Sequence, residues 1–408
     1  MQPEYTYRSA TADEWDQIST ILSEAFNEDM SDEWSAMERG VFEPERTVLA
    51  ETGGEIVGHS SAFTRDLTVP GGSVPASHVT MVGVSSLHRR RGLLRSMITR
   101  LHDDAIRRGE PIAALWASEA RIYQRFGYGQ AASRLSIDLN KNEAALRPES
   151  LLPPVGTVRR VPPDDVDTFL KVFDRALAER TGFSSRNEAW WTYVLSDLKE
   201  SRGGATALRA VVHDGPDGPD AYMLFRVKSE WGVTPSGTVQ IRELVATTPE
   251  GYQAMWQQAL AVDLTRTVYL RFGSLDEPVL YLVDEVRALE PKVTDSLWVR
   301  ILSVPDALSA RRYAAPVDVV LDVTDRDIPS NARRWRLVGG PDASSCTPTD
   351  APADLRLDIS ALGAAYLGGT TLAALAAGGR VTELTGGALA RATAGFRWHR
   401  EPAATEVF

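Results

Sequence analysis

Three consecutive arginines and a glycine lie between a predicted strand and a predicted helix. Residues 79–84 form a short β-branched and apolar run that indicates a buried strand. Residues 93–101 repeat apolar side chains at the spacing of one helix face. The first turn of a helix has backbone N–H groups without intrahelical partners and carries the positive end of the helix dipole. The segment between them, Arg89 to Gly92, could therefore hold a polyphosphate, with Gly92 allowing close approach of the backbone.

A solvated basic turn is the alternative interpretation of this segment, and the charge run by itself does not separate the two. Two other phosphate-binding motifs are excluded by the sequence. No Gly-Lys-Ser/Thr follows, as a Walker loop requires, and the Gly-x-Gly of a dinucleotide fingerprint is missing.

A tyrosine follows on the next pair of predicted elements. Residues 111–117 predict a second buried strand, and residues 122–126 lie in a short helix that ends at Gly127. A phenol with a pKa of about 10 stays protonated at neutral pH and matches a thiol leaving group. Tyr123 could therefore protonate a departing thiolate; the alternative is a tyrosine packed with Ile122 and Phe126 in the core.

These two segments together resemble the GNAT superfamily of acyl-CoA-dependent N-acetyltransferases. Arg89, Gly92 and Leu94 follow the superfamily's pyrophosphate-loop pattern, Arg/Gln-x-x-Gly-x-Gly/Ala, with Leu94 departing from the usual last residue. The stretch SEARIYQRFGYG resembles the end of a GNAT domain, where a tyrosine lies beside the cofactor sulfur. The residue that matches this tyrosine is Tyr123.

The N-terminal segment begins with an amphipathic helix. Thr11 and Glu14 form a capping box before it, and one helix face carries Trp15, Ile18, Leu22, Ala25 and Phe26. Acidic residues with interleaved aromatic ones follow: Glu28, Asp29, Asp32, Glu33, Trp34, Glu38 and Phe42. Carboxylates beside an aromatic face suit an ammonium ligand, and a solvated helix is the alternative. Residues 47–50 and 56–63 predict a hairpin, and residues 67–69 the start of another strand.

Between residues 140 and 163, polar residues and prolines interrupt the apolar pattern and indicate a domain boundary. After it, the same order of predicted helices and strands occurs a second time. This second copy is expected to contain helices over residues 166–177 and 253–264 and strands over residues 207–213, 221–228 and 239–246. Where the first copy has arginines, the second has Pro249 and Glu250, and a carboxylate there would repel a pyrophosphate. We therefore expect a degenerate domain and one CoA per chain. From about residue 297, strands alternate with short alanine-rich helices and carry no catalytic constellation.

Composition limits the remaining function classes. The chain has 408 residues, enough for two or three domains, and a net charge of -11. Acidity argues against nucleic acid as the main partner and is compatible with a cationic substrate. The single cysteine excludes an internal disulfide, and we expect no metal because no Cys/His grouping exists. Without a secretory signal or an apolar span of about 18 residues, a cytoplasmic protein with no membrane partner is expected.

Over its whole length the chain resembles the enhanced intracellular survival (Eis) family of actinobacterial aminoglycoside N-acetyltransferases. The resemblance rests on the segments VGVSSLHRRRGLLRSM and WASEARIYQRFGYG, on the second GNAT-like copy without a basic loop, on the third domain and on an aromatic C-terminal residue. It implies a mixed α/β (α+β) fold with two tandem GNAT-like domains and a sterol-carrier-like domain, which we assign to residues 1–145, 155–295 and 296–408. It also implies a homohexamer that uses acetyl-CoA to acetylate several amines of one aminoglycoside, and hence antibiotic resistance.

The resemblance also implies roles for individual residues. Val82, Gly83 and Val84 would pair with the pantetheine arm, Arg90, Arg91, Gly92, Leu93, Leu94 and Arg95 would hold the pyrophosphate, and Ser118 and Glu119 would line the acyl end. Tyr123 would be the general acid and the terminal carboxylate of Phe408 the general base. The family's amine-binding acid next to the terminus is replaced here by Val407, with Glu406 one place earlier. Phe26 and Trp34 are the candidate substrate contacts.

Two other functions stay open at this point. A protein-lysine acetyltransferase would differ only in its acceptor. A non-catalytic acyl-CoA sensor or lipid-binding module would need neither Tyr123 nor an unextended C-terminus, and release of free CoA in the presence of an aminoglycoside would distinguish it from an enzyme.

Overall fold

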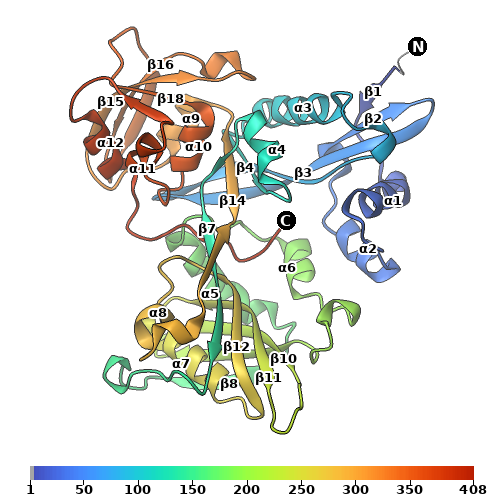
Figure 1. Cartoon of the computed structure of the whole chain (residues 1–408), viewed down its shortest axis with the longest axis vertical. Helices are drawn as coiled ribbons and strands as arrows, with labels where there is room; N and C mark the ends of the chain where they lie inside the picture. Colours follow the sequence, from blue (N-terminus) through green and yellow to red (C-terminus); the bar gives the residue numbers. More distant parts are fainter. Residues whose placement is uncertain (1–3) are drawn as a thin grey trace.

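The computed structural model describes residues 4–408. These residues fold into three β-sheets, each covered by helices (Figure 1). The first sheet has the strand order β1 (Thr6–Arg8), β2 (Thr47–Thr52), β3 (Glu55–Val69), β4 (Gly72–Val84), β5 (Ile112–Trp116), β14 (Leu297–Ile301) and β6 (Gly129–Gln130). Its helices are α1 (Trp15–Phe26), α2 (Asp32–Arg39), α3 (Leu93–Arg107) and α4 (Ala120–Tyr123). The strand and helix predicted on either side of the arginines are therefore both present.

The first domain departs from expectation in two places. Residues 67–69 end the long strand β3 instead of starting a new one, because the chain turns only at Gly71, whose φ of 73° favours glycine. Phe26 does not share the buried face of α1. The helix buries Trp15, Ile18, Ile21 and Leu22, whereas Phe26, at its last turn, is 44% exposed.

The second sheet has the order β13 (Lys292–Asp295), β7 (Ser133–Asn140), β12 (Thr265–Gly273), β11 (Gly237–Ala246), β10 (Gly218–Lys228), β9 (Arg209–Gly215) and β8 (Thr157–Val161). Its helices are α5 (Val166–Glu179), α6 (Glu188–Leu195), α7 (Pro249–Leu260) and α8 (Val279–Leu282). The helix α7 begins earlier than predicted, because Pro249 takes the first helical position and Thr248 caps it.

The third sheet has the order β17 (Ser344–Pro348), β16 (Arg334–Gly339), β15 (Val317–Thr324), β18 (Leu355–Asp358) and β19 (Val381–Glu383). It packs with α9 (Val304–Ala310), α10 (Ile359–Ala365), α11 (Leu372–Ala377) and α12 (Ala388–Phe396). The last residues leave this domain and end beside α6, between the first two domains (Figure 1). None of the helices between residues 4 and 408 combines the length and apolar character needed to cross a membrane.

Two strands join other sheets than the predicted domain boundaries imply. The strand β7, from the segment expected to belong to the first domain, pairs with β12 and β13 of the second sheet. The strand β14, expected in the third domain because it follows the boundary at residue 296, pairs antiparallel with β5 of the first sheet from Leu297↔Trp116 to Ile301↔Ile112. Figure 1 shows β14 among the strands of the first sheet. The strand patterns in the sequence predict strands there, but not the sheet that each strand joins.

Candidate active site

The strands β4 and β5 separate part of the way along the first sheet. They pair in parallel only from Ala76↔Ile112 to His78↔Ala114. Beyond that point β4 contains a bulge at Met81, whose φ is 50° and whose carbonyl accepts a hydrogen bond of 2.7 Å from Nδ1 of His59. The last residues of β4 therefore have a backbone edge that β5 does not pair, and this edge contains the predicted pantetheine contacts Val82, Gly83 and Val84.

The N-terminus of α3 has no side-chain cap. Its N-cap residue is Gly92, with a φ of 86° that glycine adopts readily, and Arg90 before it also has a positive φ of 61°. Both residues and Arg91 are exposed. Because no side chain satisfies the first N–H groups, they remain available to an anion, as the polyphosphate hypothesis requires.

Several residues that are predicted to contact the cofactor have side chains that already pack against, or pair with, other residues of the chain. Leu93 is 2% exposed in the core, and a Cβ at Gly83 would come within 2.9 Å of Ala25. Arg95 forms an ion pair of 2.6 Å with Asp327 of the third domain. Leu94 packs partly buried against the core of the first domain. Gly83, Leu93 and Leu94 can therefore meet a ligand chiefly through their backbone.

Tyr123 lies at the end of α4 and is 7% exposed. Burial, followed by the nearby Glu119 carboxylate, raises the pKa of Tyr123 to about 12, against a smaller lowering through a hydrogen bond with Ser118. Ser118 and Glu119 are themselves exposed. The ring of Tyr123 meets that of Tyr128 edge-on, with centroids 6.0 Å apart. Packing thus fixes the phenol, and its proton is retained across the neutral pH range.

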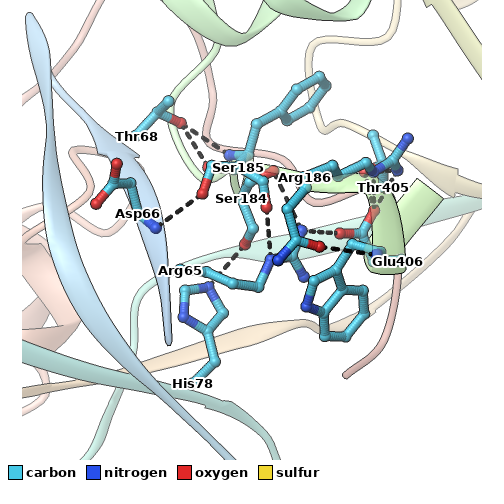
Figure 2. A network of polar contacts seen from close by, with 12 residues as sticks. Arg65, Asp66, Thr68, His78, Ser184, Ser185, Arg186, Thr405 and Glu406 are labelled. Atoms are coloured by element: carbon cyan, nitrogen blue, oxygen red, sulfur yellow. Dashed lines mark hydrogen bonds and ion pairs between the residues drawn. The ribbon is translucent and has the colours of Figure 1, made fainter. Parts of the chain in front are cut away.

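Phe408 ends the chain between the first two domains. Its ring lies 4.5 Å from that of His78 and packs against a cluster that includes Phe63 and Trp190. Burial lowers the pKa of His78 to about 3, so this imidazole is neutral. Its Nδ1 donates to the Ala76 carbonyl at 3.0 Å, and Nε2 consequently accepts from Ser184 Oγ at 2.8 Å (Figure 2). The side chain of Phe408 is therefore held in place by contacts with His78, Phe63 and Trp190.

Helix α6 of the second domain contacts helix α2 of the first, which contains the predicted substrate residue Trp34. Tyr193 on α6 donates a hydrogen bond of 3.0 Å to Glu38 on α2. Burial raises the pKa of Glu38, although hydrogen bonds from Tyr193 and the predicted substrate contact Trp34 act in the opposite direction. The cluster of acidic residues around Glu38 is visible in the sequence, but its partner Tyr193 is 155 positions away and no local pattern identifies it.

The second domain carries its own anion at the corresponding helix. At the N-terminus of α7, Thr248 Oγ1 accepts from the Gly251 N–H at 3.1 Å and donates to Asp220 at 2.7 Å. Asp220 is buried, and its backbone carbonyl accepts from the Thr247 N–H at 2.8 Å. A capped helix end that faces a protein carboxylate is unfavourable for a pyrophosphate. Thr248 and Asp220, which is also paired with His213 at 2.5 Å, therefore occupy the position that a pyrophosphate would need at this helix.

Comparison with protein-family models divides the chain into three matches. Residues 6–131 and residues 182–301 each match a model described as an acetyltransferase (GNAT) domain. Residues 304–405 match a model described as a sterol carrier protein domain. The expected architecture of two GNAT domains followed by a sterol-carrier-like domain is confirmed.

Whole-chain relatives agree with these matches. An uncharacterized N-acetyltransferase of Streptomyces avermitilis is 41% identical over 359 residues, 87% of either chain. The N-acetyltransferase Eis of Mycobacterium tuberculosis is 32% identical over 403 residues, 96% of either chain. The crystal structure of Eis1 from Mycobacterium abscessus superimposes with a TM-score of 0.86 at 31% identity, over 99% of this chain and 100% of that one. The chain is therefore an N-acetyltransferase and belongs to the Eis family.

Proposed function

We propose that this N-acetyltransferase uses acetyl-CoA to acetylate several amines of a polyamine substrate of the aminoglycoside class. The observation that carries the proposal is the uncapped N-terminus of α3, with its exposed arginines, beside the unpaired edge of β4. Tyr123 follows directly after β5, the other strand of this opening. A homohexamer in the cytoplasm, and a role in antibiotic resistance, are expectations that rest on membership in the family.

Acetyl-CoA fits the side-chain and backbone groups around this opening. The N–H groups at the start of α3, together with Arg90 and Arg91, would hold its pyrophosphate. The backbone of residues 82–84 would hydrogen-bond the amide groups of the pantetheine arm. Ser118 and Glu119, exposed beside Tyr123, would line the acyl end.

Two groups of this chain would move protons. When bound, acetyl-CoA supplies a thioester carbonyl that the acceptor amine attacks and a thiolate that leaves. The carboxylate of Phe408, with an ordinary pKa of about 3.3–3.7, is ionised at neutral pH and can take the proton of the acceptor ammonium, through a water molecule. Tyr123 keeps its proton below its pKa of about 12 and can donate it to the thiolate. Direct attack needs no covalent enzyme intermediate.

The acceptor side suits a cationic amine. Glu38 supplies a carboxylate there, and Trp34, which hydrogen-bonds Glu38, supplies an aromatic face beside it. The overall charge of -11 favours approach of a polycation. Phe26, exposed at the end of α1, remains a predicted substrate contact.

A mass spectrum of polyamines after incubation with acetyl-CoA tests this proposal. We expect more than one acetyl group on a single aminoglycoside, with equivalent release of free CoA. Tyr123→Phe should lower kcat by roughly 10²–10⁴-fold, the usual contribution of a general acid, and leave the KM for acetyl-CoA unchanged. Acetylation of protein lysines without acetylation of any polyamine, or full turnover by Tyr123→Phe, would contradict it.

A further inference from the structure

The C-terminal tail is bound along the second domain before it reaches the first. The Glu401 N–H donates to Asp276 at 3.1 Å, and the Glu401 carbonyl accepts from Arg180 at 3.1 Å. Two residues later, the Ala403 N–H donates to the Thr181 carbonyl at 2.9 Å. At Gly182 the φ is 93° and a Cβ would collide with the Ala403 carbonyl. This approach between tail and domain is therefore one that only glycine permits.

The path of the tail passes the site that corresponds to the cofactor opening of the first domain. The parallel strands β11 and β12 pair only as far as Ile241↔Leu270. Beyond that point the ends of β11 and β12 and the start of α7 line a cavity of about 400 Å³, and residues 403–405 of the tail form part of its wall. The domain without a cofactor loop thus binds the tail along its corresponding opening.

Glu406 fixes the tail by ion pairs to two domains. Arg65, on β3 of the first domain, donates from Nη2 to Glu406 Oε1 at 2.6 Å. Arg186, in the loop before α6 of the second domain, donates from Nε to Glu406 Oε2 at 3.1 Å and also binds it through Nη2. Figure 2 shows Glu406 between the two guanidinium groups. The side chains of Arg65 and Arg186 are 1% and 0% exposed, so water screens neither ion pair appreciably.

The two arginines are held independently of the tail. Arg65 donates to the Ser184 and Ser185 carbonyls at 3.2 and 2.6 Å. Arg186 binds Glu243 at 2.5 and 3.1 Å. When Glu406 is in place, the guanidinium groups of Arg65 and Arg186 are balanced by the carboxylates of Glu243 and Glu406. Burial alone would raise the pKa of Glu406, but Arg186 and Arg65 outweigh it and hold that pKa well below its usual range.

We propose that Glu406, Arg65 and Arg186 form a clamp that positions the terminal carboxylate of Phe408, and that the second GNAT domain serves as the dock for this tail. The proposal rests on the proposed role of Phe408 as general base. An extended chain advances about 3.3 Å per residue, so a fixed Glu406 leaves the terminus only two residues of freedom. The three side chains are positioning residues, because they act through Phe408.

The substitution Glu406→Gln tests the proposal, because it removes the negative charge of the clamp and keeps the size of the side chain. In Glu406→Gln we expect carboxypeptidase to release Phe408 at least roughly tenfold faster, because cleavage follows the population of released tail. We expect kcat to fall roughly 10–100-fold, since displacement of a catalytic group by about 1 Å costs this much. The KM for acetyl-CoA should stay within about twofold, because its predicted contacts lie on β4 and α3.

Two comparisons separate positioning from general destabilisation. Glu110→Gln breaks another buried ion pair of the first domain, with Arg46 at 2.5 Å, and should lower the melting temperature without faster release of Phe408. In a chain extended by one glycine after Phe408, Glu406→Gln should cause no further loss of kcat, because residues that act as a unit are not additive.

Release of Phe408 at the wild-type rate in Glu406→Gln would overturn the clamp. Additive losses of kcat in the extended chain would also overturn it. If the glycine extension itself leaves kcat unchanged, the proposed role of Phe408 fails, and the carboxypeptidase rates still decide whether the clamp exists.

Discussion

Removal of β14 from the first sheet should unfold the catalytic domain. Leu297, Val299 and Ile301 are fully buried, and Trp298 is 4% exposed. Burial of one such side chain contributes about 1.5–3 kcal/mol to the free energy of unfolding. The four side chains together contribute roughly 6–12 kcal/mol, which is an upper estimate because the unfolded chain already buries part of this surface. A domain of this size has a net stability of about 5–15 kcal/mol. We therefore expect a fragment of residues 1–131, which lacks β14, to lose cooperative folding.

Urea unfolding followed by circular dichroism measures this effect. The matched control is the same fragment with residues 296–408 attached through a flexible linker, which restores β14 between β5 and β6 together with the third domain against which Leu297, Val299 and Ile301 pack. We expect a cooperative transition only in the linked fragment. An unlinked fragment that unfolds cooperatively, at the midpoint of the linked one, would refute the argument that the first domain is incomplete without β14.

Two further predictions concern binding and acid stability. Calorimetric titration should show one acetyl-CoA per chain, because Thr248 caps the N-terminus of α7 and the Asp220 carboxylate lies beside this cap; two sites per chain would contradict this. Burial lowers the pKa of His59 to about 4 and of His78 and His102 to about 3. Below the unfolded pKa of 6.5 the unfolded chain therefore binds more protons, and the free energy of unfolding should fall by about 1.4 kcal/mol per pH unit for each histidine down to its folded pKa. Urea midpoints at pH 7 and 5 check this, and His102→Gln should reduce the slope; equal midpoints at the two pH values would show the reasoning to be wrong.

The strand, basic loop and helix of the proposed cofactor site could be predicted from the sequence because they are contiguous in the chain. A strand, three arginines, Gly92 and a helix follow one another within 30 residues, and each has a local signature. Tyr123 follows after one more strand. In the third domain, the alanine-rich helices α10, α11 and α12 and the strands β15, β16 and β18 likewise have local apolar patterns, whereas the helix α9 was not predicted.

The rest depends on contacts between distant segments. The partners of Glu406 are 341 and 220 positions away, and a single glutamate near a C-terminus carries no sign of two buried arginines. The strands β7 and β14 both have ordinary strand patterns, so nothing local indicates that they join other sheets than the predicted domain boundaries imply. Asp220 at α7 was missed for the same reason, and the expectation for this helix rested on Glu250.

The most direct test of the proposed mechanism is to neutralise the terminal carboxylate without changing its size. Semisynthesis can convert the carboxylate of Phe408 to a carboxamide. We predict that kcat with an aminoglycoside falls by roughly 10²–10⁴-fold, the usual contribution of a general base, while the affinity for acetyl-CoA stays unchanged. A carboxamide enzyme that turns over at the wild-type rate would contradict the assignment of Phe408 as the base.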